Sequence, residues 1–135
     1  MPDYRLPPWR CPHLAPLATV IIHGRVLGRN VTEPVRVLLD SGADYTEIPL
    51  GVARALGLKR SGEKTINGRP KPDPTYYAHV ELERRIFDVV VIASDEFRVN
   101  GEVWGLIGRD ILNEAVVLNG PRRVYEVAPM SAAAT

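Results

Sequence analysis

Residues 37–44 read Val-Leu-Leu-Asp-Ser-Gly-Ala-Asp, and this stretch decides the fold. Three apolar residues suited to a buried strand end abruptly in an acid, Asp40, which is followed by the small hydroxyl residue Ser41 and by Gly42. A carboxylate buried at the end of a strand is costly unless it is hydrogen-bonded, paired or used. Asp40 is therefore the first candidate for a functional residue.

A second apolar strand also runs into a glycine. Residues 103–112 read Val-Trp-Gly-Leu-Ile-Gly-Arg-Asp-Ile-Leu, and the segment after Gly108 has the pattern of a short helix. Asp-Ser-Gly alone occurs by chance in many turns. The two segments in this order and at this separation form a more specific pattern, whose meaning depends on the structural context.

The composition indicates one domain without a strong net charge. A chain of 135 residues is one domain by length, and 17 Lys and Arg against 16 Asp and Glu leave a formal charge of +1. No global field then attracts nucleic acid or a membrane surface. The sequence also lacks the ~18 consecutive apolar residues of a membrane span and the pattern of a secretory signal. We expect a cytoplasmic protein that binds neither nucleic acid nor membrane.

The chain is predicted to be mainly β with one or two short helices. An apolar run of β-branched residues bounded by Gly24 predicts the first strand, and a return strand is expected from Arg25 or Val26. A short helix is expected over residues 49–56, with Gly57 as its stop. Residues 86–93 are continuously apolar apart from Asp88, which predicts a strand buried on both faces. Two final strands are expected at residues 115–118 and 124–127.

A long hairpin is predicted from about Glu63 to Ala78. Asn67 and Gly68 are a tight-turn signal, and Arg69 follows them at the tip. The prolines in the next residues stiffen this tip and remove amide donors; they are Pro70, Pro72 and Pro74.

The ends of the chain differ from its middle. Five prolines in residues 1–16 predict an extended arm, residues 17–128 form the expected domain, and residues 129–135 are expected to be a loose tail.

Together the two motifs resemble the retropepsin family of aspartic proteases. In that family an Asp-Thr/Ser-Gly-Ala loop is followed, some tens of residues later, by two apolar residues, a glycine and a short helix. The resemblance covers about Thr19 to Val127 and implies a closed, β-barrel-like acid protease fold with one lobe per chain. It implies that Asp40, Ser41 and Gly42 are catalytic, that the substrate is a peptide or protein, and that no cofactor is needed.

Peptide hydrolysis by carboxylates needs two of them facing each other, and one motif supplies one. Asp95 and Asp110 lack the glycine that follows the motif's acid by two residues. An aspartic protease built from this chain must therefore be a homodimer, with the Asp40 residues of two chains meeting on a two-fold axis.

The resemblance also implies roles for the neighbouring residues. Ser41 would hydrogen-bond across the dimer, and Ala43 is small enough to line the floor of the cleft. Asp44 would bind the substrate main chain and form a partly buried ion pair with Arg109, which follows Gly108. Ile107 would contact substrate. The long hairpin would be a flap that closes over the peptide, with the residues at its tip contacting it; these are Asn67, Gly68 and Arg69.

Three other interpretations stay open. The same fold could be a catalytically silent dimerisation and peptide-binding domain, although an intact Asp-Ser-Gly-Ala loop favours the enzyme, because a binding module has no reason to hold two carboxylates in repulsion. The chain could be an unrelated β-barrel with a chance Asp-Ser-Gly. Cys11, His13, His23 and His79 could bind zinc, but no second pair at ligand spacing exists, so no metal site is expected.

Overall fold

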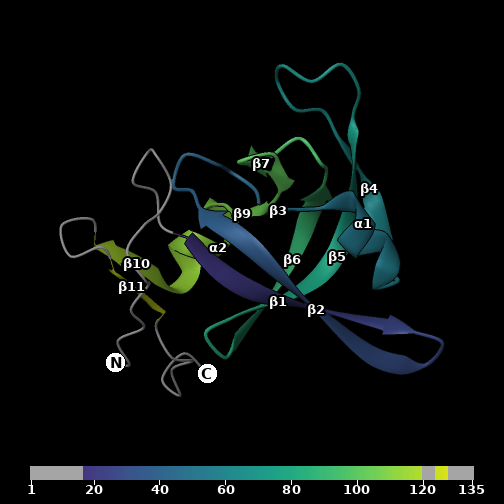
Figure 1. Ribbon diagram of the computed structural model, residues 1–135, viewed down its shortest axis with the longest axis horizontal. Helices are drawn as coiled ribbons and strands as arrows, with labels where there is room; N and C mark the ends of the chain where they lie inside the picture. The colour runs from purple at the N-terminus through teal and green to yellow at the C-terminus, as the bar shows by residue number, and fades with distance from the viewer. Residues whose placement is uncertain (1–16, 120–123, 128–135) are drawn as a thin grey trace.

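The computed structural model describes residues 17–119 and 124–127 (Figure 1). The predicted N-terminal arm, the C-terminal tail and the last turn lie outside the described residues. The elements, in chain order, are β1 (Leu17–Val26), β2 (Arg29–Leu39), β3 (Glu47–Ile48), α1 (Leu50–Ala55), β4 (Arg60–Lys64), β5 (Asp73–Leu82), β6 (Arg85–Ala93), β7 (Arg98–Val99), β8 (Glu102–Val103), β9 (Gly105–Ile107), α2 (Arg109–Ala115), β10 (Val116–Asn119) and β11 (Val124–Val127).

Six strands form a closed barrel. Their order is β1-β2-β9-β3-β6-β5, and β5 returns to β1 through antiparallel pairing of residues 79–81 with residues 21–23. β4 lies outside this ring on the edge of β5. The predicted mainly β, barrel-like fold with two short helices is confirmed.

The core fills the barrel from alternate positions of each strand, as the pleat requires. The inward residues of β1, β2 and β5 include Val20, Ile22, Val37, Leu39 and Val80, all at most 2% exposed. Ile107 from β9 and Ile111 from α2 complete this cluster and are fully buried.

The prediction that residues 86–93 are buried on both faces is wrong for the first half of β6. Ile86 and Val90 are 46% and 43% exposed, whereas the strand's last three residues, Val91, Ile92 and Ala93, are buried. β6 pairs with β5 along residues 85–92, and only its end also pairs with β3, at Ile92 and Ala93. Before that end one face of the strand is toward the core, and the outward apolar side chains meet solvent.

Gly24 does not end the first strand, as the sequence predicted, but lies inside β1, opposite Val31 of β2. The chain turns instead at Leu27 and Gly28, which both have positive φ, as a two-residue hairpin of type I′ requires. The final hairpin is confirmed, because β10 and β11 pair antiparallel.

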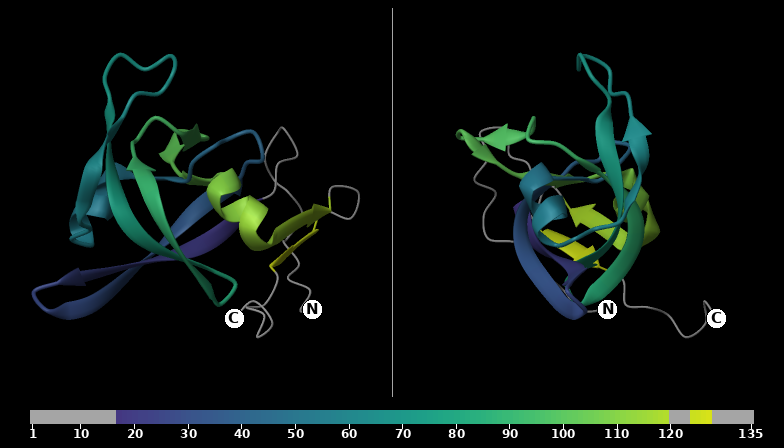
Figure 2. Two further views of the ribbon diagram at one scale, coloured as in Figure 1. Left: turned by 180° about the vertical axis from the view of Figure 1, so that it is seen from behind. Right: turned by 90° about the vertical axis from the view of Figure 1, so that its right-hand side faces the viewer.

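The connection between β4 and β5, residues 65–72, projects away from the barrel (Figures 1 and 2). We call these residues the flap loop, because they form the tip of the predicted hairpin.

Candidate active site

The barrel brings the two sequence motifs together as neighbouring strands. β2 and β9 pair in parallel, with Leu38 opposite Leu106 and Leu39 opposite Ile107. The backbone N–H of Asp40 donates to the carbonyl of Ile107 at 2.9 Å. Asp40 therefore leaves the barrel wall beside the second motif, although the two are far apart in the chain.

The acid loop, residues 40–44, holds the Asp40 carboxylate through a main-chain hydrogen bond. The N–H of Gly42 donates to Asp40 Oδ1 at 2.8 Å, and the N–H of Ala43 donates to the Asp40 carbonyl at 3.1 Å. A Cβ at position 42 would lie 3.1 Å from the same Oδ1, which explains the glycine. Asp40 is half-buried, and in the described single chain the Ser41 hydroxyl has no hydrogen-bond partner.

Gly108 of the second motif allows the acid loop to pack on α2. A Cβ there would lie 2.6 Å from the backbone carbon of Tyr45, so only glycine permits this approach. The N–H of Arg109 then donates to the Ala43 carbonyl at 2.8 Å. These backbone contacts join the loop to the start of α2.

Thr46 and Asp110 brace this junction, a role that the sequence analysis missed. The Thr46 hydroxyl donates to Asp110 Oδ1 at 2.7 Å, and the Thr46 N–H donates to Oδ2 at 2.9 Å. The hydroxyl also accepts from the N–H of Gly108 at 3.3 Å, and the N–H of Ile111 donates to Asp110 at 2.9 Å. Thr46 is fully buried, and no local sequence pattern marks it, because its neighbours Tyr45 and Glu47 are polar as well.

The other carboxylates near the site are engaged in structure. Asp110 holds Thr46 and the first turn of α2, and Asp95 accepts from the N–H of Leu50 at the start of α1 at 3.1 Å. Among the residues described, no cluster of three or more His, Cys, Asp or Glu side chains could hold a metal ion.

Asp44 and Arg109 form the predicted ion pair. Their side chains are 64% and 47% exposed in the single chain, and the expectation that the pair is partly buried in a dimer stays a prediction. The two residues follow the acid loop and the second motif at the rim of the barrel, where solvent reaches both side chains.

Arg69 of the flap loop belongs to a second, buried group of charges that the sequence did not predict. Its guanidinium donates to both oxygens of Glu47 at 2.9 and 3.1 Å and to Asp73 at 2.6 Å. The three side chains are only 18%, 7% and 17% exposed. We call Arg69, Glu47 and Asp73 the flap clamp, because it ties the flap loop to β3.

Burial and charge act in opposite directions in the flap clamp. Burial raises the pKa of Glu47 above its usual 4.5, and this effect outweighs the opposing charge and hydrogen bonds of Arg69. Burial alone would lower the pKa of Arg69, but the hydrogen bonds and charges of Asp73 and Glu47 raise it. The arginine stays charged, and Glu47 bears the greater cost of burial.

A cavity of about 430 Å³ lies between the acid loop and the flap loop. Three predicted site residues, Ala43, Asp44 and Asn67, line it. The other predicted catalytic and substrate-binding residues do not; these are Asp40, Ser41, Gly42, Gly68, Arg69 and Ile107. Lys64 Nζ lies 4.2 Å from the centre of the Tyr45 ring and joins β4 to the end of the acid loop. The other lining residues are Glu47, Thr65, Ile66, Ile92 and Leu106.

A strand-end acid held by a Gly42 amide, beside a second apolar strand ending in glycine, defines the class of aspartic proteases. The family model for aspartyl proteases matches residues 19–111, more than half of the chain, and the protein belongs to this family. A search of curated proteins found no match.

Two solved structures resemble the chain. A retropepsin-like aspartic protease from Rickettsia conorii is 10% identical with a TM-score of 0.56, over 92% of this chain and 87% of the other. EIAV protease in complex with the inhibitor HBY-793 is 21% identical with a TM-score of 0.49, over 74% of this chain and 86% of the other. The family match and the fold shared with the Rickettsia conorii protein confirm the retropepsin-like fold inferred from the two motifs. Neither helix in the described part of the chain is long and apolar enough to cross a membrane.

Proposed function

We propose that the protein is an aspartic endopeptidase, active as a homodimer in which the Asp40 carboxylates of two chains activate one water molecule. The observation that carries the proposal is the different use of the nearby acids. Among the described residues, the Asp40 carboxylate is hydrogen-bonded only within its own loop, whereas the carboxylates of Asp95 and Asp110 support helices and that of Asp44 pairs with Arg109. One chain thus supplies one available carboxylate, and the reaction needs two.

The proposed mechanism requires the two acids to share one proton, because like charges about 3 Å apart do not both ionise. The ionised carboxylate takes a proton from water as the water oxygen attacks the peptide carbonyl carbon, while the protonated carboxylate donates to the carbonyl oxygen. The resulting gem-diol collapses as the C–N bond breaks. The protonated carboxylate donates its proton to the amine nitrogen, and the ionised carboxylate takes the proton of one gem-diol hydroxyl, so the products are a carboxylic acid and an amine and the dyad again holds one proton.

The cavity beside the acid loop supports an extended substrate. Its apolar lining, Ile66, Ile92 and Leu106, suits an apolar peptide side chain, and Asn67 and Asp44 offer polar groups to the main chain. The flap loop forms its outer wall and would exclude water from the bound peptide. The free Ser41 hydroxyl of each chain is available to bond across the dimer.

The test is cleavage of a diverse peptide library, followed by mass spectrometry, with Asp40→Asn and a matched control. Asp40→Asn is expected to lower the rate by at least about 10³-fold with the fold retained, because it removes the base and keeps the shape. Glu33→Gln makes the same change at an exposed position of β2 and should leave the rate unaltered. Cleavage by Asp40→Asn at the wild-type rate would exclude Asp40 as the catalyst.

Dilution tests the shared site. The active fraction of a homodimer falls by mass action below its dissociation constant, so specific activity should fall together with the molecular mass in solution. Specific activity that persists in a demonstrated monomer would exclude a shared dyad. A stable dimer that binds peptides and cuts none would favour the alternative, a catalytically silent peptide-binding domain.

A further inference from the structure

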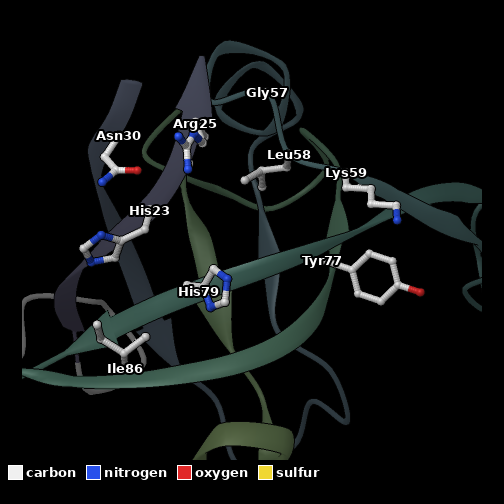
Figure 3. Close-up of a pocket in the computed structure, with 10 residues that line it drawn as sticks. His23, Arg25, Asn30, Gly57, Leu58, Lys59, Tyr77, His79 and Ile86 are labelled. Carbon is white, nitrogen blue, oxygen red and sulfur yellow. The ribbon is translucent and has the colours of Figure 1, made fainter. Parts of the chain in front are cut away.

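A second hollow lies on the outer face of the barrel and shares no residue with the cavity beside the acid loop (Figure 3). Its volume is about 550 Å³, within the usual range for small-molecule sites. We call it the outer hollow. It is lined by His23, Gly24, Arg25, Asn30, Gly57, Leu58, Lys59, Tyr77, His79 and Ile86.

The hollow forms where β1 and β5 diverge. The two strands pair only as far as His23 and His79, and residues 56–59 then fill the gap between them. The N–H of Arg25 donates to the Leu56 carbonyl at 3.0 Å, and the N–H of Tyr77 donates to the Lys59 carbonyl at 2.9 Å. Main-chain hydrogen bonds on both sides therefore fix the end wall of the hollow.

Two glycines make this wall possible. A Cβ at Gly24 would lie 2.3 Å from the Leu56 carbonyl oxygen, and a Cβ at Gly57 would lie 2.7 Å from the Arg25 carbonyl oxygen. Gly57 also has a φ of +61°, which favours glycine. The hollow is thus part of a rigid barrel wall and does not depend on a loose loop.

The lining of the outer hollow carries basic groups and no acid. Arg25 and Lys59 are exposed, and neither makes an ion pair with any other described residue. Figure 3 shows Arg25 coming from β1 and Lys59 from the segment after α1, on two sides of the hollow. Two unpaired cations around one concave surface favour a negatively charged ligand.

The acids bound to the two lining histidines are not themselves part of the lining. His23 Nε2 is hydrogen-bonded to Glu81 at 2.8 Å, and His79 Nδ1 is hydrogen-bonded to Asp88. Neither Glu81 nor Asp88 lines the hollow. The remaining ring nitrogens, Nδ1 of His23 and Nε2 of His79, take no part in these bonds and are available to a ligand as donors or acceptors.

Apolar surface lies beside these charges. Tyr77 is 53% exposed and Ile86 is 46% exposed, which is high for side chains of this size, and Leu58 lies with them in the lining. An inorganic anion would leave this surface in water. An apolar or aromatic group on the ligand would cover it.

We propose that the outer hollow binds a small organic anion, with its carboxylate or phosphate near Arg25 and Lys59 and its apolar body against Tyr77. The inference is independent of the proposed peptidase activity, because it concerns a different surface and is tested by binding alone.

The experiment is a titration of the ¹⁵N-labelled full chain with phenyl phosphate, followed by ¹H–¹⁵N NMR. Saturable shifts are expected at the amides of Gly24, Gly57, Lys59 and Tyr77. Inorganic phosphate and benzyl alcohol, which each carry half of the probe's chemistry, should both bind more weakly. Shifts scattered over the surface, no saturable shift, or equal affinity for inorganic phosphate would overturn the proposal.

Charge variants locate the site. Arg25→Gln with Lys59→Gln should weaken phenyl phosphate binding about tenfold, because two charge-assisted contacts are lost. Lys71→Gln with Arg98→Gln removes the same charges at exposed positions elsewhere and should not alter it. If both double variants lost the same affinity for phenyl phosphate, the effect would come from net charge and not from this site, and the proposal would be overturned. Tyr77→Ser, a change at an exposed position, gives a second test that does not depend on charge.

Discussion

Two arginine–carboxylate groups flank the candidate active site, and they differ in almost every physical respect. Arg109 and Asp44 join the second motif to the acid loop in an ion pair exposed to water. Arg69, Glu47 and Asp73 join the flap loop to the barrel in a buried clamp. An exposed pair contributes about 0–1 kcal/mol, whereas breaking a buried pair leaves an uncompensated charge and costs several kcal/mol. The same chemistry therefore has different consequences on the two sides of the cavity.

The comparison changes how the flap loop is understood. The sequence predicts a stiff hairpin tip from its prolines, with Arg69 available to substrate. In the structure the Arg69 guanidinium is instead hydrogen-bonded to Glu47 and Asp73, and Asn67 lines the cavity. Opening of the flap loop at this point would have to break the Arg69–Glu47 pair, whether or not Asp73 moved with Arg69.

The largest effect is expected from Arg69→Met. It removes the one cation between Glu47 and Asp73 and should lower the free energy of unfolding by about 3 kcal/mol at pH 7. Urea unfolding measures it, with Arg109→Met as the matched control. If the free energy of unfolding fell by the same small amount in the two variants, the difference in burial between the clamp and the exposed pair would have no effect on stability.

Asp110→Ala is expected to cost about 2 kcal/mol, because it leaves the buried Thr46 hydroxyl and N–H without their acceptor. Asp95→Ala is the control, since Asp95 accepts one hydrogen bond at the start of α1 and its loss should cost about 1 kcal/mol. Thermal unfolding compares the two. A larger loss for Asp95→Ala would show that the junction of acid loop and α2 does not depend on the brace.

The pH dependence of stability sharpens the account of the flap clamp. The pKa of Glu47 is raised above 4.5 in the folded state, so between 4.5 and that raised pKa the folded chain binds more protons than the unfolded chain. Its contribution to stability is full below pH 4.5 and is lost as the pH rises through the folded pKa. Relative to Glu47→Gln, the wild type should therefore lose stability from pH 4 to pH 7. If the wild type instead gained stability relative to Glu47→Gln as the pH rose, the interaction with Arg69 would outweigh the cost of burying Glu47.

The acid loop and several strands were predictable from sequence because their signals are local, whereas the closed barrel followed only from the resemblance of the two motifs to a known family. Both motifs can be found without knowledge of the fold. One is an apolar strand that ends in Asp40 and Gly42, and the other is an apolar strand that ends in Gly108. The flap clamp was not predictable, because Glu47 and Arg69 are 22 residues apart and their contact depends on how the flap loop folds back. The outward face of β6 was missed for a related reason, since the apolar run does not show which face of the strand the barrel leaves uncovered.

The smallest effect is expected from Arg109→Gln. Solvent screens the pair with Asp44, and the main-chain bond from the Arg109 N–H to Ala43 survives the change. The free energy of unfolding of the monomer should fall by less than about 1 kcal/mol, and the difference should vanish in about 1 M salt, where the screening length is about 3 Å. Urea unfolding at low and high salt checks this. A loss as large as that of Arg69→Met, independent of salt, would show that water does not screen the pair, as would follow if the proposed dimer covered it.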